Sequence, residues 1–263
     1  PEPMGPETIL AAIAAGSAIG LVLALVGGGG SILAVPLLVY VVGVSSPHAA
    51  IGTAAVAVAL NAASSLAGHA RSGNVKWPCA VTFALAGVVG AALGAEAGKA
   101  MDGQRLLALF GALMVLVGLS MLRPRKTADN PDVRLERSTA SVLLPRLIPT
   151  GFGVGLLAGF FGIGGGFLIV PGLVMATRMP LRIAVGTSLV VVTALGLTTA
   201  TSYALSGFVD WALVGLMVVG GVIGAGIGIP LGKRLASRKR AMELGFAVLV
   251  IVIGGYVILR GLA

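Results

Sequence analysis

Two glycine-rich runs have the composition of an anion-binding main chain. They occupy residues 27–31 (Gly-Gly-Gly-Gly-Ser) and 162–166 (Gly-Ile-Gly-Gly-Gly), and each directly precedes a short apolar run. A turn of this kind before a short helix can direct several unpaired backbone N–H groups and the positive end of the helix dipole at one point. Close packing of helices is the alternative use of such glycines. On the first interpretation, the candidate anion-binding residues are Gly28, Gly29, Gly30, Ser31, Gly164, Gly165 and Gly166.

Polar side chains inside later apolar runs form the second group of candidates. A Gly-Thr pair recurs at positions 52–53 and 186–187. Hydroxyl and amide groups can donate hydrogen bonds to an oxyanion where water is scarce, but they can equally bond a carbonyl of their own helix or of a neighbouring helix. The candidate side-chain contacts to a substrate are Thr53, Asn61, Thr187 and Ser188.

Few ionisable side chains lie within apolar runs. Glu96 precedes Lys99 by three residues, so an ion pair near the membrane surface is the simplest interpretation, and proton coupling is the alternative. For His69 and Arg182, an interfacial or orienting role competes with a role in gating. The coupling or gating candidates are therefore His69, Glu96 and Arg182. A single cysteine and two histidines provide no ligand cluster for zinc or haem, so no metal or other cofactor is predicted.

These groups must be positioned by helices inside a membrane. The chain has 263 residues, of which 57% are hydrophobic and 10% charged, and its mean hydropathy is +1.05. A soluble domain carries about a quarter charged residues. Most apolar runs here are long enough to cross a hydrocarbon core of roughly 30 Å. The net charge of +9 is typical of basic cytoplasmic loops rather than of nucleic-acid binding. The sequence predicts an all-helical integral membrane protein without an extramembrane active site.

The apolar runs form two sets of five, and the second set repeats the first. When Gly186-Thr187 is aligned with Gly52-Thr53, two Ser-Gly pairs, two tryptophans and several regularly spaced glycines also align without a gap. This agreement indicates an internal duplication. The predicted units are an N-terminal repeat (1–122), a basic linker (123–146) and a C-terminal repeat (147–263). Glycines at every fourth position predict close helix packing at Gly90, Gly94, Gly98, Gly220, Gly224, Gly228 and Gly232.

The second run of each set, at residues 32–44 and 167–176, is too short to cross the membrane. Each is expected to form a hairpin with the preceding run, with the glycine turn buried near the midplane. This arrangement places fifteen of the 18 basic residues on one side, whereas single broken crossings would divide them nine and nine. Because cytoplasmic loops are enriched in Lys and Arg, the hairpins are favoured. They predict inverted repeats, both termini outside and a cytoplasmic linker.

These motifs resemble those of the TauE/SafE sulfite exporter family. The resemblance rests on two copies of Gly-x-Gly-Gly-(Gly/Ser)-x-Leu-x-Val-Pro, at residues 27–36 and 162–171, each followed by a Gly-Thr pair, and it covers about residues 8–259. It implies a secondary transporter of the bacterial inner membrane that moves a small sulfur-containing oxyanion, such as sulfite or an organosulfonate. Export, often driven by an ion gradient, is the usual direction. The first copy departs from the second at Gly28 and Ser31, where Ile163 and Gly166 stand.

Two transport mechanisms fit these features. An alternating-access carrier would place its site between the two hairpin tips near the midplane. An anion channel could line a continuous pore with the same helix ends. Saturable anion flux and counterflow distinguish the carrier from the channel. A membrane-embedded enzyme would need a set of catalytic groups at depth, which Glu96 and His69 do not provide.

Overall fold

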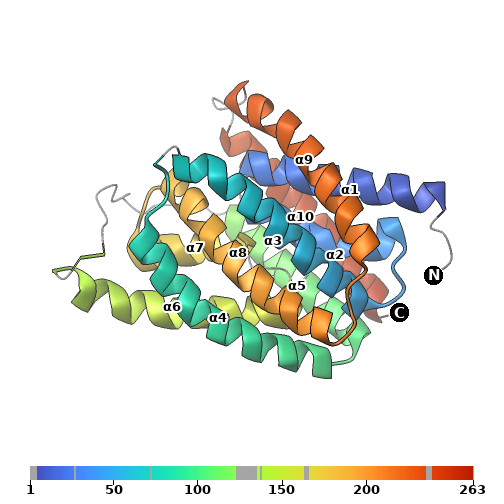
Figure 1. Cartoon of the computed structure of the whole chain (residues 1–263), viewed down its shortest axis with the longest axis horizontal. Coiled ribbons are helices and arrows are strands. Elements are labelled where there is room, and N and C mark those ends of the chain that lie inside the picture. Colours follow the sequence, from blue (N-terminus) through green and yellow to red (C-terminus); the bar gives the residue numbers. More distant parts are fainter. Residues whose placement is uncertain are drawn as a thin grey trace.

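A computed structural model shows a bundle of helices (Figure 1). It describes residues 5–26, 28–71, 73–122, 135–136, 138–162, 166–234 and 239–262, and there is no strand within these residues. The elements in chain order are α1 (Pro6–Val26), the 3-10 helix η1 (Gly28–Leu33), α2 (Ala34–Leu37), the π-helix η2 (Leu38–Val42), α3 (Pro47–Arg71), α4 (Trp77–Ala100), α5 (Gly103–Leu122), α6 (Ala140–Phe161), α7 (Gly166–Thr177), α8 (Leu181–Leu205), α9 (Trp211–Arg234) and α10 (Lys239–Leu262).

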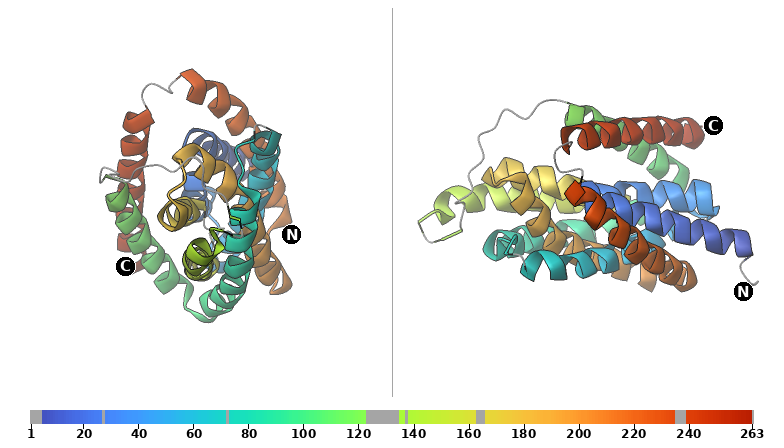
Figure 2. Two further views of the ribbon diagram at one scale, coloured as in Figure 1. Left: turned by 90° about the vertical axis from the view of Figure 1, so that its left-hand side faces the viewer. Right: turned by 90° about the horizontal axis from the view of Figure 1, so that it is seen from above.

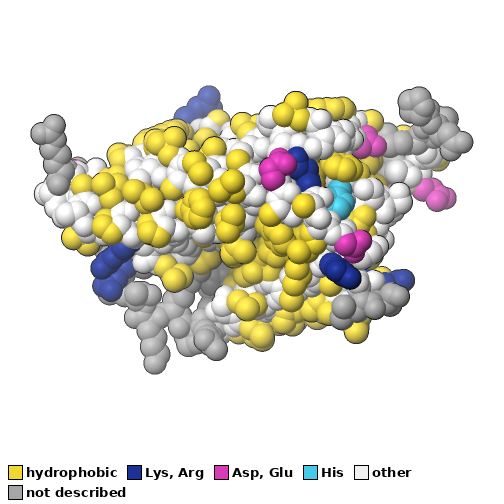
Figure 3. Space-filling view, turned by 90° about the horizontal axis from the view of Figure 1, so that it is seen from below, with side chains coloured by type: hydrophobic (Ala, Val, Ile, Leu, Met, Phe, Trp, Pro, Cys, Tyr) yellow, Lys and Arg dark blue, Asp and Glu magenta, His cyan; other side chains and the backbone are white. Residues whose placement is uncertain are grey.

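The lengths of the helices confirm the predicted mixture of long and short segments. Among the described residues, eight helices are long and apolar enough to cross a membrane, and two shorter apolar helices cover Gly30–Val42 and Gly166–Thr177. Large apolar side chains on the outside, such as Leu85, Leu116 and Val252, are about two-thirds exposed and suit contact with lipid. On the face in Figure 3, apolar side chains extend over most of the surface, and the acidic and histidine side chains lie in its right-hand half.

The repeat seen in the sequence recurs in the helix boundaries. Helices α8 and α9 begin and end at the positions that the repeat aligns with the bounds of α3 and α4 (47 with 181, 71 with 205, 77 with 211 and 100 with 234). Both α3 and α8 end in the same turn, in which Gly73 and Gly207 have positive φ angles of 68° and 76°. The following N–H groups of Asn74 and Phe208 donate to the carbonyls of His69 and Tyr203. This is a Schellman cap, which satisfies otherwise unpaired helix carbonyls.

Glycine ridges bring helices of the two halves into backbone contact. A Cβ atom on Gly94 of α4 would overlap the carbonyl oxygen of Leu156 on α6, and one on Gly224 of α9 would overlap that of Ser17 on α1. Gly90, Gly98 and Gly220 make the same kind of close approach, and a Cβ atom on Gly228 would press on the Ala24 side chain. These contacts confirm the predicted packing role of the four glycines. The surroundings of Gly232 lie outside the description. In the repeat, α4 corresponds to α9 and α6 corresponds to α1, so the α4–α6 contact and the α1–α9 contact are equivalent.

Helices that correspond in the two halves also pack against each other, and they run antiparallel. In the central pair α3 and α8, Gly52 lies against Tyr203 while Gly196 lies against Ala59. In the pair α5 and α10, which lies to one side of the bundle in Figure 2, Gly111 lies against Gly254 and Gly118 against Ala247. Antiparallel packing of corresponding helices is what a two-fold axis in the membrane plane produces. It supports the inverted arrangement, which stays a prediction until sidedness is measured.

Two local features differ from the expectation. Helix α6 begins at Ala140, inside the predicted linker, because the helix continues through Pro145 and Pro149. The first short segment is divided into 3-10, α and π stretches, whereas α7 is continuous. Both contain a proline at the corresponding place, so the proline does not account for the difference. Linker residues 123–134 and 137 lie outside the described residues.

Candidate functional site

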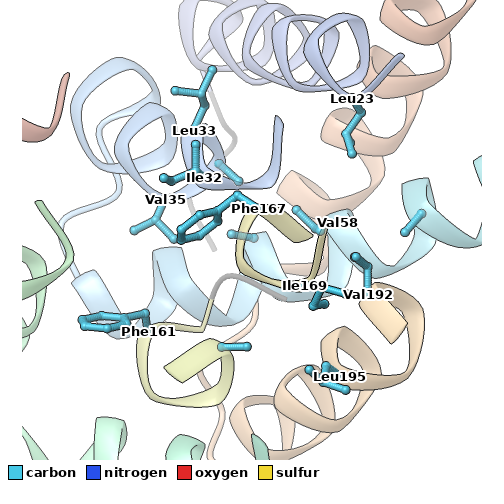
Figure 4. Packing of buried hydrophobic residues seen from close by; sticks show 14 of the residues in the cluster. Leu23, Ile32, Leu33, Val35, Val58, Phe161, Phe167, Ile169, Val192 and Leu195 are labelled. Atoms are coloured by element: carbon cyan, nitrogen blue, oxygen red, sulfur yellow. The ribbon is translucent and has the colours of Figure 1, made fainter. Parts of the chain in front are cut away.

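The two short segments meet in the interior of the bundle. Helix α7 packs against η1, as the hairpin prediction requires. Figure 4 shows Ile32 and Val35 of the first segment beside Phe167 of the second. Ile32 and Phe167 occupy corresponding positions of the glycine motif, and they are only 1% and 6% exposed. The glycine-bearing ends of the two segments are therefore close together and are covered by an apolar contact.

The predicted main-chain donors lie at these ends. Gly28, Gly29 and Gly30 form the first half of η1, and Ser31 is fully buried within it. Gly30 packs so closely on Ile19 and Leu23 of α1 that a Cβ atom would press on their backbone. Gly166 is the buried first residue of α7. Gly164 and Gly165 lie outside the described residues. The first N–H groups of a helix have no partner within it, so these ends offer donors rather than acceptors.

The turn of the second hairpin lies beside the beginning of α3. Gly162, which caps α6 with a φ angle of 67°, would place a Cβ atom on the side chain of Ile51. Ile51 belongs to the second turn of α3. This contact places the turn of the second hairpin beside the first two turns of α3. Only glycine combines this backbone angle with this contact.

Asn61 differs from its counterpart in the other half. Its side chain is 7% exposed and packs against Gly221 of α9, which in turn lies on Gly20 of α1. The corresponding residue, Leu195, packs in the same way against Gly87 of α4. Within the part of the chain that the structure describes, the Asn61 side chain has no hydrogen-bond partner. Its two N–H donors are therefore available to a ligand.

The two threonines of the Gly-Thr pairs are placed at opposite ends of the central helix pair. The Thr53 Oγ1 atom accepts a hydrogen bond from the Asp210 N–H at 3.0 Å. The Thr187 Oγ1 atom accepts one from the Lys76 N–H at 3.1 Å. Ser188, next in the chain, donates to the Val185 carbonyl at 2.7 Å. The structure thus brings the hairpin ends together but separates the two threonines, and it gives each a protein partner.

The ion pair predicted for Glu96 and Lys99 is confirmed. Their side chains lie 2.7 Å apart in the last two turns of α4. Ser202 donates to Glu96 at 2.8 Å, and Lys99 donates to Ser206 at 3.0 Å. The two serines, on or just after α8, were not among the candidates. The one signal in the sequence was the alignment of Ser206 with Ser72 in the repeat.

The remaining gating candidates lie near helix ends. His69 is in the last turn of α3, and its backbone carbonyl forms part of the cap described above. The corresponding Tyr203 is fully buried, and within the described residues its hydroxyl has no hydrogen-bond partner. Arg182 is the second residue of α8, and its side chain lies outside the description.

Comparisons with known proteins find relatives over nearly the whole chain. A probable membrane transporter protein of Xylella fastidiosa strain Temecula1 is 47% identical to this chain over 262 residues, which cover 98% of this chain and 97% of that protein. The probable membrane transporter protein YunE of Bacillus subtilis is 28% identical over 260 residues, covering 92% and 94% of the two chains. A third, from Methanocaldococcus jannaschii, is 25% identical over 249 residues, covering 88% and 89%. No solved structure matches the chain.

The family comparison covers nearly the whole protein. The model of the sulfite exporter TauE/SafE family matches residues 12–257, which include both glycine motifs, both Gly-Thr pairs and all but the ends of the helical bundle. Together with eight helices able to cross a membrane, this match shows an integral membrane transporter. The chain belongs to the TauE/SafE sulfite exporter family of membrane proteins.

Proposed function

We propose that this protein is a secondary active transporter that exports a small sulfur-containing oxyanion, sulfite or an organosulfonate, by alternating access. The observation that carries the proposal is the contact between η1 and α7, two short helices that correspond in the repeat and bear glycines at their first turns. Paired broken helices of this kind are a common way for transporters to hold an ion inside the membrane. The family supports the sulfur oxyanion as the substrate class.

The site is built from uncharged donors. Backbone N–H groups of Gly28, Gly29, Gly30, Ser31 and Gly166 would bind the oxyanion, with Gly164 and Gly165 completing the second end. The amide of Asn61 would add side-chain hydrogen bonds, whereas the Ser188 hydroxyl already donates to the Val185 carbonyl. No Lys or Arg is buried among the described residues. Neutral donors hold an anion moderately, which suits a carrier that must release it.

The same proposal includes the orientation in a bacterial inner membrane. Both termini and the loop between α4 and α5 lie outside, and the basic linker lies in the cytoplasm. The charge distribution supports this orientation, and the antiparallel packing of α3 with α8 supports the inversion of the repeats.

Cysteine labelling in intact cells tests the orientation. In a Cys79→Ala background, Thr127→Cys in the linker is expected to react with a membrane-impermeant maleimide only after the membrane is permeabilised. Asp102→Cys, between α4 and α5, is expected to react in intact cells. Labelling of Thr127→Cys from outside, with Asp102→Cys protected, would reverse the proposed orientation.

Uptake into proteoliposomes tests the substrate class. Radiolabelled sulfite and a small organosulfonate are compared with sulfate and chloride at equal concentration. We expect saturable uptake of sulfite or the organosulfonate, and at least a tenfold lower uptake of chloride. Equal flux of all four anions would instead support the channel, in which the apolar contact of Ile32 with Phe167 would have to open to a wet pore.

A further inference from the structure

Two hydrogen bonds join the halves of the protein in the same way. In one, Thr53 of α3 accepts from the N–H of Asp210, which directly precedes α9. In the other, Thr187 of α8 accepts from the N–H of Lys76, which directly precedes α4. The two acceptors are aligned by the repeat, and so are the two donors. Both threonines are fully buried. Each bond supplies a partner to an N–H at the start of a helix that would otherwise lack one.

The neighbouring glycines make each contact a close approach of backbone to backbone. A Cβ atom on Gly52 would overlap the carbonyl oxygen of Phe208, and one on Gly186 would overlap that of Asn74. These pairs also correspond in the repeat. The loop between α8 and α9 therefore rests on α3, and the loop between α3 and α4 rests on α8. Each Gly-Thr pair is the surface on which a loop of the other half docks.

The two contacts lie at opposite ends of the molecule. Thr53 is in the second turn of α3 and Thr187 in the second turn of α8, and these helices run antiparallel. Each helix has 25 residues, or about 37 Å at 1.5 Å per residue. One contact is therefore near the outer surface in the proposed orientation, and the other is near the cytoplasmic surface.

We propose that the Thr53–Asp210 and Thr187–Lys76 contacts are the outer and inner latches of the transport cycle. This inference rests on the proposed function, because a carrier must separate its halves at one surface while keeping them together at the other. The structure has both latches closed. A single hydrogen bond between uncharged groups shifts an equilibrium by only about 2- to 10-fold, which is small enough for the bond to break and re-form during each cycle. When a latch opens, water replaces the threonine at the backbone N–H.

The outer latch is reinforced by further bonds, one of which the sequence excludes at the inner latch. Lys99 of α4 donates to Ser206 and to the Ser202 carbonyl, next to the docked loop, and Ser202 donates to Glu96. These bonds also join the two halves. At the inner end, the positions of Glu96 and Ser202 are taken by Pro230 and Gly68, so the side-chain hydrogen bond between Glu96 and Ser202 has no counterpart there. The outer latch is therefore closed for more of the time, and the protein at rest opens mainly toward the cytoplasm.

Cysteine accessibility in proteoliposomes tests the latches with a matched pair of reporters. Ala50 and Ala184 correspond in the repeat, precede Thr53 and Thr187 by three residues, and are both fully buried. In a Cys79→Ala background without substrate, Ala184→Cys is expected to react faster than Ala50→Cys. Thr53→Val, which keeps the shape but cannot accept the bond, is expected to raise labelling of Ala50→Cys about 2- to 10-fold and not that of Ala184→Cys.

The mirror variants give the opposite result. Thr187→Val is expected to raise labelling of Ala184→Cys alone, and Thr→Ser at either position is expected to leave labelling as in the parent because the acceptor is kept. If a valine variant does not fold, Gly52→Ala and Gly186→Ala displace the same loops and are expected to act on the same reporters. Equal changes at both reporters, or none at either, would overturn the latches. Labelling requires no transport, so this result is independent of whether counterflow is found.

Discussion

Gly224→Leu is expected to leave little folded protein, whereas Gly226→Leu, two residues along the same helix, is expected to behave as the parent. A Cβ atom at Gly224 would meet the backbone of Ser17 and Leu21 on α1, and nothing lies within 4 Å of a Cβ atom at Gly226. Overpacking typically costs about 1–3 kcal/mol, and more where backbone must move. The backbone of α1 cannot move aside as a flexible side chain can. The helix face at Gly226 is exposed, so a leucine side chain there would contact lipid without displacing protein atoms.

The yield of monodisperse protein after detergent extraction and its unfolding temperature measure this difference. The pair controls for the general effect of adding a leucine to α9. Normal yield and stability of Gly224→Leu would contradict the close approach of α1 and α9. A loss with both variants would show that α9 tolerates no leucine on either face.

Asn61→Leu is expected to weaken transport strongly while leaving the protein at least as stable. The change makes α3 like α8 at this position, where Leu195 already packs on a glycine of the other half. It removes an amide that has no hydrogen bond within the described residues, so stability is expected to stay level or to rise. A hydrogen bond to a charged ligand contributes about 1.5–3 kcal/mol, which corresponds to a roughly 10- to 100-fold increase in KM.

Sulfite uptake and thermal unfolding are measured on the same preparation of this variant. Thr193→Val serves as the control, because the Thr193 hydroxyl already donates to the Leu189 carbonyl of its own helix. Unchanged KM in Asn61→Leu would remove Asn61 from the binding site. A large drop in unfolding temperature would show instead that the amide stabilises the fold.

The arrangement of helices followed from the sequence because the membrane restricts it. The lengths of the apolar runs identified the eight long helices and the two short ones, because the bilayer thickness sets the length that a crossing helix needs. The repeat placed the boundaries of α3, α4, α8 and α9 in register. Glycines at every fourth position identified the packing faces of α4 and α9, and the structure shows that their partners are α6 and α1. Each of these features depends on local pattern or on repetition, which are both visible in one sequence.

The partners of the polar side chains could not be predicted in the same way. Thr53 was a candidate for substrate contact because of its residue type, but its partner Asp210 is 157 positions away and is brought there by the packing of α3 with α8. The pairing of Glu96 with Lys99 was visible because it is local, whereas that of Glu96 with Ser202 was not. The difference between Asn61 and Leu195 was present in the alignment of the repeats. Only the packing of both side chains on glycines of the other half shows that the two residues occupy equivalent positions in the structure.

Counterflow in proteoliposomes is the most direct test of the proposed carrier. Vesicles containing the purified protein are loaded with unlabelled sulfite and diluted into a trace of radiolabelled sulfite. Alternating access predicts a transient accumulation of label above its equilibrium level, absent from protein-free vesicles and reduced in Asn61→Leu. Rapid equilibration of label without an overshoot, at a rate independent of the sulfite inside, would contradict a carrier and show a channel.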